Sequence, residues 1–151
     1  MDIINNLEWF FNAPKDAIVR ETMKKITKKQ LKTIVFDDSV KENVRFQFPL
    51  NDDFTFTETR ELPRPITVEQ ILTLARDFYS EPLTQGNIDK SFGENIKYKN
   101  EWEDNMIDFC NGDMHQLTNI DLFDSTCTPD FCGIHALEEN PGEYFINVGP
   151  E

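Results

Sequence analysis

Three residues near the C-terminus have a loose spacing that could hold a metal ion. Cys127, Cys132 and His135 form a C-x4-C-x2-H pattern, and His115 or Cys110 would supply a fourth ligand. Structural zinc needs four nitrogen or sulfur ligands in tetrahedral geometry, and its cysteines usually come in closely spaced pairs. The second pair is missing here. The pattern therefore fits zinc less well than it fits Cys110 in the core and two buried loop thiols.

Other catalytic groups have less specific spacing. Three cysteines and two histidines permit a Cys–His pair, but no cysteine opens a predicted helix beside a glycine, where its thiol pKa would fall. Carboxylates that could serve metal-dependent phosphoryl chemistry occur at Asp121, Asp124 and Asp130, and at Glu138 and Glu139. Among 28 acidic residues such groups arise freely, which favours a solvated surface. The six glycines form no phosphate-binding motif.

A run of cations is the strongest local signal. Its members are Arg20, Lys24, Lys25, Lys28, Lys29 and Lys32. Such a run is typical of a surface that binds nucleic acid, an anionic membrane or an acidic protein, and equally of a solvated helix face. Residues 1–45 carry nine basic and seven acidic groups (+2), whereas residues 46–151 carry six and twenty-one (−15). Because the acidic part would repel phosphate, the pattern favours an acidic protein partner, including a second copy of this chain.

Length and composition predict one domain, residues 1–151, with no cofactor. Hydrophobic residues make up 38% and charged residues 28%, which excludes a disordered or collagen-like chain. The net charge of −13 argues against a nucleic-acid-binding surface over the whole molecule. Three cysteines do not make a disulfide framework and indicate a reducing, intracellular compartment. We expect no signal peptide and no membrane span, because no long apolar run occurs.

The spacing of apolar residues and the positions of turn residues predict the helices and strands that carry the candidate site residues. Pro49 predicts a strand that lies at a sheet edge or ends there, and residues 113–133 are rich in loops. The predicted elements are a basic helix at about 15–32, strands at 33–36, 44–50 and 54–57 (the last two a hairpin), helices at 67–80, 84–92 and 100–110, and a C-terminal hairpin of 134–138 and 144–148. This order indicates an α+β fold, with helices on a mainly antiparallel sheet. A basic N-terminal helix would precede an acidic α+β body at about 33–151.

Residues 62–151 resemble small proteins of large nucleocytoplasmic DNA viruses of the marseillevirus and mimivirus kind. The resemblance rests on 63–84, where a helix ends in Phe78-Tyr79 and a Pro-Leu-Thr turn leads into a second helix, and on the terminal run 142–149. That family carries a Phe-Glu-Gly-Leu type of run before the hairpin, whereas this chain has Phe-Cys-Gly-Ile at 131–134. The resemblance implies a protein of the host cytoplasm or the virion and supplies no catalytic residues.

Three classes of function follow from these signals. The first is a non-enzymatic, virion-associated or infection-stage protein that binds an acidic protein face through the six cations. The second is an acidic mimic of nucleic acid that sequesters a DNA-binding protein. The third is a small metal-dependent hydrolase or nuclease. The cation run favours the first class, for which we predict no catalytic residue.

Overall fold

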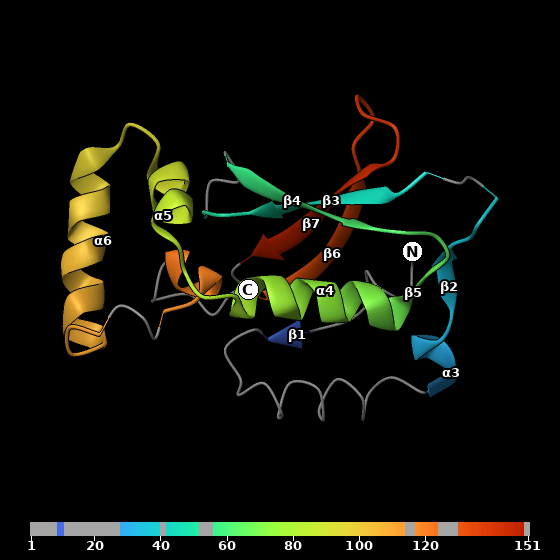
Figure 1. The fold of residues 1–151 in the computed structure, drawn as a ribbon, viewed down its shortest axis with the longest axis horizontal. Helices are drawn as coiled ribbons and strands as arrows, with labels where there is room; N and C mark the ends of the chain where they lie inside the picture. The colour runs from blue at the N-terminus through green and yellow to red at the C-terminus, as the bar shows by residue number, and fades with distance from the viewer. Residues whose placement is uncertain are drawn as a thin grey trace.

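The computed structural model has a β-sheet that packs on one long helix, with two further helices at one end of the molecule (Figure 1). The structure describes residues 9–10, 28–39, 42–51, 56–113, 117–123 and 130–149. Its fold is α+β, as the order of elements predicted. The sheets are mainly antiparallel, which was also predicted.

The larger sheet has five strands, and segments from both halves of the chain meet in it. Their order in the sheet is β1 (Trp9–Phe10), β6 (Asp130–Ala136), β7 (Glu143–Gly149), β3 (Val44–Pro49) and β4 (Thr57–Leu62). Strands β3 and β7 run parallel, and the other neighbours are antiparallel. A smaller sheet pairs β2 (Ile34–Phe36) with β5 (Ile66–Thr67).

Alternating side chains of β3 form the centre of the core. Val44, Phe46 and Phe48 are fully buried beneath α4 (Val68–Ser80). The ring of Phe48 stacks on Phe78 of α4 at a centroid distance of 4.5 Å. Aromatic pairs of this kind add to the stability that burial provides. The predicted capping box of α4 is present, because Thr67 and Gln70 bond to each other's backbone N–H groups.

The first hairpin differs from the prediction in the position of its second strand. The described strand, β4, runs over Thr57–Leu62, whereas the prediction was 54–57, of which residues 54 and 55 lie outside the described ranges. Its residues Glu58 and Arg60 lie opposite Phe48 and Phe46, and their charges are paired with other groups. Charged residues at these positions remove the apolar alternation by which a strand is recognised. Pro49 ends β3, and β3 lies inside the sheet, so the edge alternative for this proline is wrong.

Within the described ranges, three helical segments follow α4. They are α5 (Gln85–Phe92), α6 (Ile96–Phe109) and the 3-10 helix η2 (Asn119–Leu122). The side chain of Thr84 caps α5, and Gly93 ends it with a φ of +56°. Helix α6 begins one turn earlier than predicted and is followed by Asn111 and Gly112, both with positive φ.

The two ends of the chain bear on the remaining predictions. The C-terminal hairpin is confirmed, and its turn is closed by a hydrogen bond from the Glu143 N–H to the Asn140 carbonyl at 3.1 Å.

Of the predicted basic helix, the structure describes α3 (Lys28–Leu31), and residues 11–27 lie outside the described ranges. The described residues share one main core that includes Leu31 and Ile146. A single domain over the whole chain stays a prediction.

Candidate functional site

The described members of the cation run lie at one end of the molecule, on α3 and the residue after it (Figure 1). Lys28, Lys29 and Lys32 are exposed, whereas Leu31 is 7% exposed and belongs to the main core. Ile34, two residues further on, is 54% exposed. We call Lys28, Lys29, Lys32 and Ile34 the basic surface. Arg20, Lys24 and Lys25 lie outside the described residues.

Backbone hydrogen bonds attach the basic surface to the core. The Val68 N–H donates to the Thr33 carbonyl at 3.0 Å, and Ile34 pairs with Thr67 across the small sheet. The Thr33 hydroxyl donates to the Lys29 carbonyl at 3.1 Å and closes the end of α3. The exposed side chains therefore extend from a backbone that is fixed to the fold.

The ammonium groups of the basic surface make no ion pair within the described part of the chain. Elsewhere in that part, cations are engaged with carboxylates or, for Arg64, with the carbonyls of Glu42 and Asp37 and the ring of Phe36. Lys97 of α6 is the only other described cation that lacks such a contact. The basic surface thus concentrates positive charge that no described carboxylate neutralises.

The carboxylate that follows β2 is committed to other donors. Ser39 donates its hydroxyl and its backbone N–H to Asp37, and these hydrogen bonds, with the Ser39 side chain the largest cause, lower the pKa of Asp37. The charge of Arg64 acts in the same direction. Asp37 is thus ionised and already bonded, and the lysines of the basic surface remain available to an acidic group on a partner.

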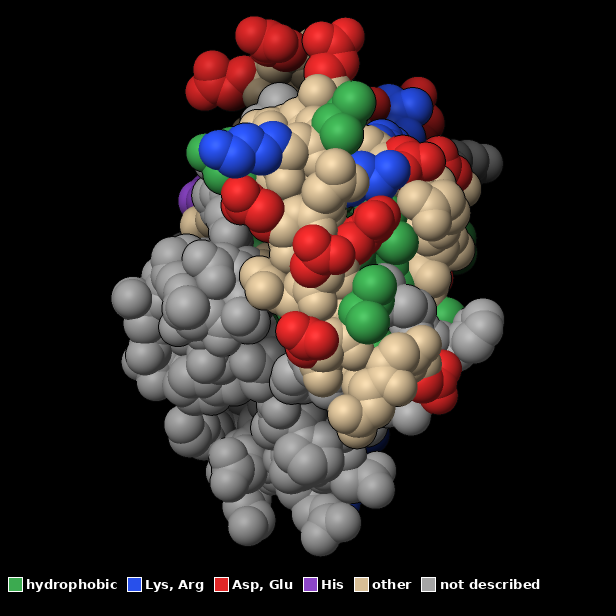
Figure 2. All heavy atoms as spheres, turned by 90° about the vertical axis from the view of Figure 1, so that its left-hand side faces the viewer, with side chains coloured by type: hydrophobic (Ala, Val, Ile, Leu, Met, Phe, Trp, Pro, Cys, Tyr) green, Lys and Arg blue, Asp and Glu red, His purple; other side chains and the backbone are tan. Residues whose placement is uncertain are grey.

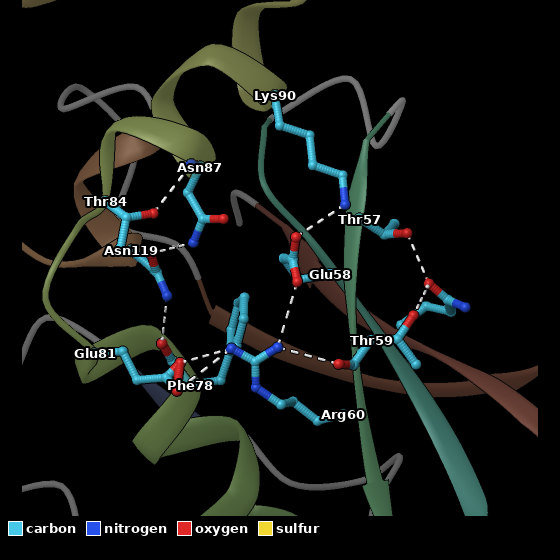
Figure 3. A network of polar contacts seen from close by, with 11 residues as sticks. Thr57, Glu58, Thr59, Arg60, Phe78, Glu81, Thr84, Asn87, Lys90 and Asn119 are labelled. Carbon is cyan, nitrogen blue, oxygen red and sulfur yellow. Dashed lines mark hydrogen bonds and ion pairs between the residues drawn. The ribbon is translucent and has the colours of Figure 1, made fainter.

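A second charged cluster, missed in the sequence, connects β4 to α4 and α5 (Figure 3). Arg60 Nη2 lies 3.1 Å from Glu81 Oε2, Arg60 Nη1 lies 3.4 Å from Glu58 Oε2, and Lys90 Nζ lies 2.9 Å from Glu58 Oε1. The guanidinium also covers the Phe78 ring at 5.1 Å. The hydrogen bond from Lys90 lowers the pKa of Glu58. The signal available in the sequence was the pair of opposite charges at Glu58 and Arg60, because residues two apart lie on the same face of a strand.

Buried amides continue this cluster toward η2. Asn119 is 1% exposed, donates to the Phe78 carbonyl at 2.8 Å and accepts from Asn87 Nδ2 at 3.1 Å. The N–H of Asn87 in turn donates to the hydroxyl of Thr84. The contacts drawn in Figure 3 join β4 to β3, to the end of α4 and to α5, and join η2 to α4 and α5. The cluster therefore braces α5 and η2 against α4 and the sheet, and it contains no cysteine or histidine that could act as a nucleophile or base.

Helix α6 is attached to this assembly through few residues. Trp102 Nε1 donates to the Asp121 carbonyl at 2.9 Å, and its ring lies 5.6 Å from that of Phe92. Lys99 pairs with Asp89 of α5 at 2.8 Å, and this hydrogen bond lowers the pKa of Asp89. Most of the remaining side chains of α6 face solvent.

Helix α6 exposes three large hydrophobic side chains, of which Ile96 and Ile107 share one side of the helix. Ile96 is 66%, Tyr98 59% and Ile107 45% exposed. Figure 2 looks onto this end of the molecule, where separate hydrophobic patches alternate with Asp and Glu. Because the predicted helix began at residue 100, Ile96 was not placed on it. The eleven-residue spacing of Ile96 and Ile107, three helical turns, is the signal that would have found this face.

The potential metal ligands are not brought together in the described residues. Cys110 is buried with Met106 and Leu117, and its Sγ contacts the Met106 carbonyl, as expected for a core residue. His135 is exposed on β6. Cys127, His115 and the side chain of Cys132 lie outside the described set, and among the groups within it no three His, Cys, Asp or Glu could hold a metal ion.

The clustered carboxylates also have individual roles or positions. Asp121 accepts from the Thr118 N–H at 2.8 Å and caps η2. Glu138 and Glu139 are exposed at the hairpin turn, and Asp124 and the side chain of Asp130 fall outside the described residues. The structure thus gives Asp121 a capping role, and it describes no shared site for these acids.

Within the described ranges, no helix is both long and apolar enough to cross a membrane. Comparisons with protein-family models, with curated proteins and with solved structures give no match to this chain.

Proposed function

We propose that the chain is a non-enzymatic interaction module that binds an acidic protein face through the basic surface. One observation carries this proposal: three exposed lysines and an exposed isoleucine lie within residues 28–34, and no described acidic side chain forms an ion pair with these lysines. The rest of the described chain pairs its cations almost throughout. An unneutralised cation cluster is complementary to a carboxylate-rich partner surface.

Charge and apolar character together favour protein over nucleic acid as the partner. The net charge of −13 opposes every polyanion, and it opposes a nucleic acid, which carries a charge on every phosphate, more than a protein face with a few carboxylates. Ile34 adds an exposed apolar residue beside the cations in the sequence, and protein interfaces place apolar residues inside a polar rim. A protein partner with both carboxylates and an apolar contact would satisfy both features.

The resemblance of residues 62–151 supports a viral setting for this module. We infer an intracellular protein of a large DNA virus that acts during infection or within the particle. Mass spectrometry of purified particles tests the second location. Recovery of the chain in amounts comparable to structural components supports a virion role, and its absence restricts the proposal to the infected cell.

The binding test uses labelled poly-L-glutamate as the acidic protein probe, with duplex DNA as the competing class of polyanion. Fluorescence anisotropy at low ionic strength, about 20 mM, preserves contacts between exposed charges. We expect the full chain to bind poly-L-glutamate more tightly than DNA. The K28E/K29E/K32E variant should lose this binding at least about tenfold, while the K28R/K29R/K32R variant, which keeps the charges, retains it.

Three results would overturn the proposed function. Preference for DNA would assign the basic surface to nucleic acid. Equal binding by wild type and the K28E/K29E/K32E variant, or no binding by wild type, would remove the basic surface as a docking site for acidic proteins. Circular dichroism of each variant establishes that the fold is intact before any of these results is interpreted.

A further inference from the structure

The outward arc of α6 combines exposed isoleucines with carboxylates that lack ion pairs. At 100° per residue, Ile96 and Ile107 lie within about 20° of each other on the helix. Glu101, Asp104 and Asp108 are exposed, follow at i, i+3 and i+7, and therefore line the adjoining strip. These five residues are called the α6 face. Within the described chain, none of its carboxylates is in an ion pair.

The exposed apolar side chains of the described residues gather at the two ends of the molecule. Ile34 lies in the basic surface, and the other large ones belong to α6. Figure 1 places α3 and β2 at the end opposite α6. Single exposed hydrophobic residues are common, but three of these four lie in two surfaces of opposite charge, and Tyr98 lies on another side of α6.

These two surfaces are complementary in both respects. Lysines accompany an isoleucine at one end, and carboxylates accompany isoleucines at the other. The basic surface of one molecule lies too far from its own α6 face to contact it (Figure 1). Residues 81–113, which contain α5 and α6, carry three basic and eight acidic groups, a balance of −5. Lys97 is the cation at the start of this arc.

We propose that the α6 face binds the basic surface of a second copy of this chain, head to tail. This inference rests on the proposed function and names its acidic partner. Because the two surfaces differ and lie at opposite ends, the contact is heterologous, and each bound pair keeps one free surface of each kind. Association therefore continues into chains or a ring.

The contact is small and dominated by charge. A few side chains from each copy bury less than the roughly 1,200 Å² at the lower limit of standard interfaces. Association should accordingly be weak, dependent on protein concentration and reduced by salt, since exposed charges more than about 10 Å apart are screened at 0.1 M. Sedimentation velocity over a concentration series measures all three properties.

The decisive experiment mixes two charge-neutralised proteins. One is K28Q/K29Q/K32Q, which keeps only the α6 face, and the other is E101Q/D104N/D108N, which keeps only the basic surface. We expect wild type to form species larger than dimers, each variant alone to stay monomeric, and the equimolar mixture to stop at a dimer. Neutral substitutions are used because reversed charges on the two variants would attract each other and create a second contact.

The outcomes separate this inference from the proposed function. Wild type that stays monomeric at every concentration and low salt, or variants that assemble alone, would overturn the head-to-tail contact. If wild type is monomeric but binds poly-L-glutamate through its lysines, only the identity of the partner is wrong. If poly-L-glutamate binding is absent as well, the proposed function fails with it. Binding of the α6 face to an unrelated basic protein in place of a second copy also contradicts the inference.

Discussion

The two ends of this molecule are attached to the fold by different means and present opposite charges. The α3–β2 end is part of the main core through Leu31 and Phe36, and its backbone bonds to the start of α4. The α6 end packs on a small separate cluster around Met106 and is joined to the rest by Trp102. Both ends leave most of their remaining side chains exposed.

This difference shows that an exposed surface can be attached to the fold either through the main core or through a small separate cluster. At the basic surface, one buried leucine and a strand pairing hold several exposed cations. At the α6 face, one half-buried tryptophan supports a helix of fourteen residues. Fewer buried contacts imply that α6 opens locally at a lower free energy than the sheet. The α6 end should thus be the easier one to detach by mutation.

Replacement of Trp102 by Ala should have the largest effect. It removes the ring contact with Phe92 and the hydrogen bond to the Asp121 carbonyl. We expect a loss of about 2–4 kcal/mol in unfolding free energy, toward the lower side of buried Trp truncations because the side chain is half-buried. Hydrogen exchange should show lost protection in 96–109 while β3 and β7 stay protected. Equal loss in both regions would contradict separate anchoring.

Replacement of Leu31 by Ala should have the next largest effect, at the opposite end. Leu31 is 7% exposed and packs in the main core, so truncation should cost about 2 kcal/mol by chemical denaturation. Because the main core continues beneath the sheet, hydrogen-exchange protection should also fall in β2 and α4. Protection of α6 should stay nearly unchanged. An effect confined to α3 would show that this end is no better integrated than α6.

The sequence predicted the elements of both ends to different degrees. The capping box at Thr67, the turn at Asn140 and the end of α5 at Gly93 depend on local chemistry and were found. Strand β4 was misplaced because Glu58 and Arg60 occupy core-facing positions, and only tertiary ion pairs make this tolerable. The order of strands in the sheet likewise depends on contacts between distant segments.

The candidate site was predicted in part. Charge alone identified the lysines of the basic surface, since a cation run is visible in the sequence. Ile34 appeared as an ordinary strand residue, because periodicity does not tell which face of a two-stranded sheet is covered. The α6 face was missed with the first turn of its helix. The zinc pattern stays a prediction, because Cys127, His115 and the side chain of Cys132 lie outside the described residues.

Replacement of Arg60 by Ala should have a smaller effect, at the connection between the sheet and the α5–α6 end. The change removes two ion pairs and the contact with the Phe78 ring. Since Arg60 is partly exposed, we expect a loss of about 1 kcal/mol. Arg60→Lys keeps the charge but not the two-pronged geometry, and should recover only part of this stability. Full recovery by lysine would show that charge alone matters here.

Acid should loosen the α6 end through Asp89. Its pKa is lowered from 3.8 by the hydrogen bond from Lys99, so the link stabilises the fold above that pH and is lost as pH falls through the lowered value. Protection of α6 against hydrogen exchange should therefore decline below pH 3.8. The Asp89→Asn variant should show lower protection at neutral pH and a flatter dependence on acid. An unchanged profile in that variant would exclude Asp89 as the titrating group.

Two variants of equal net charge test the complementarity of the ends most directly. Lys29→Glu and Lys97→Glu each replace an exposed lysine without a described ion pair, and each changes the net charge from −13 to −13 − 2 = −15. The measurement is the dissociation constant for self-association at low salt. The account predicts that Lys29→Glu weakens association about two- to fivefold, whereas Lys97→Glu, which makes the α6 face more acidic, strengthens it. Equal shifts in the same direction would contradict the account, because net repulsion would then explain both.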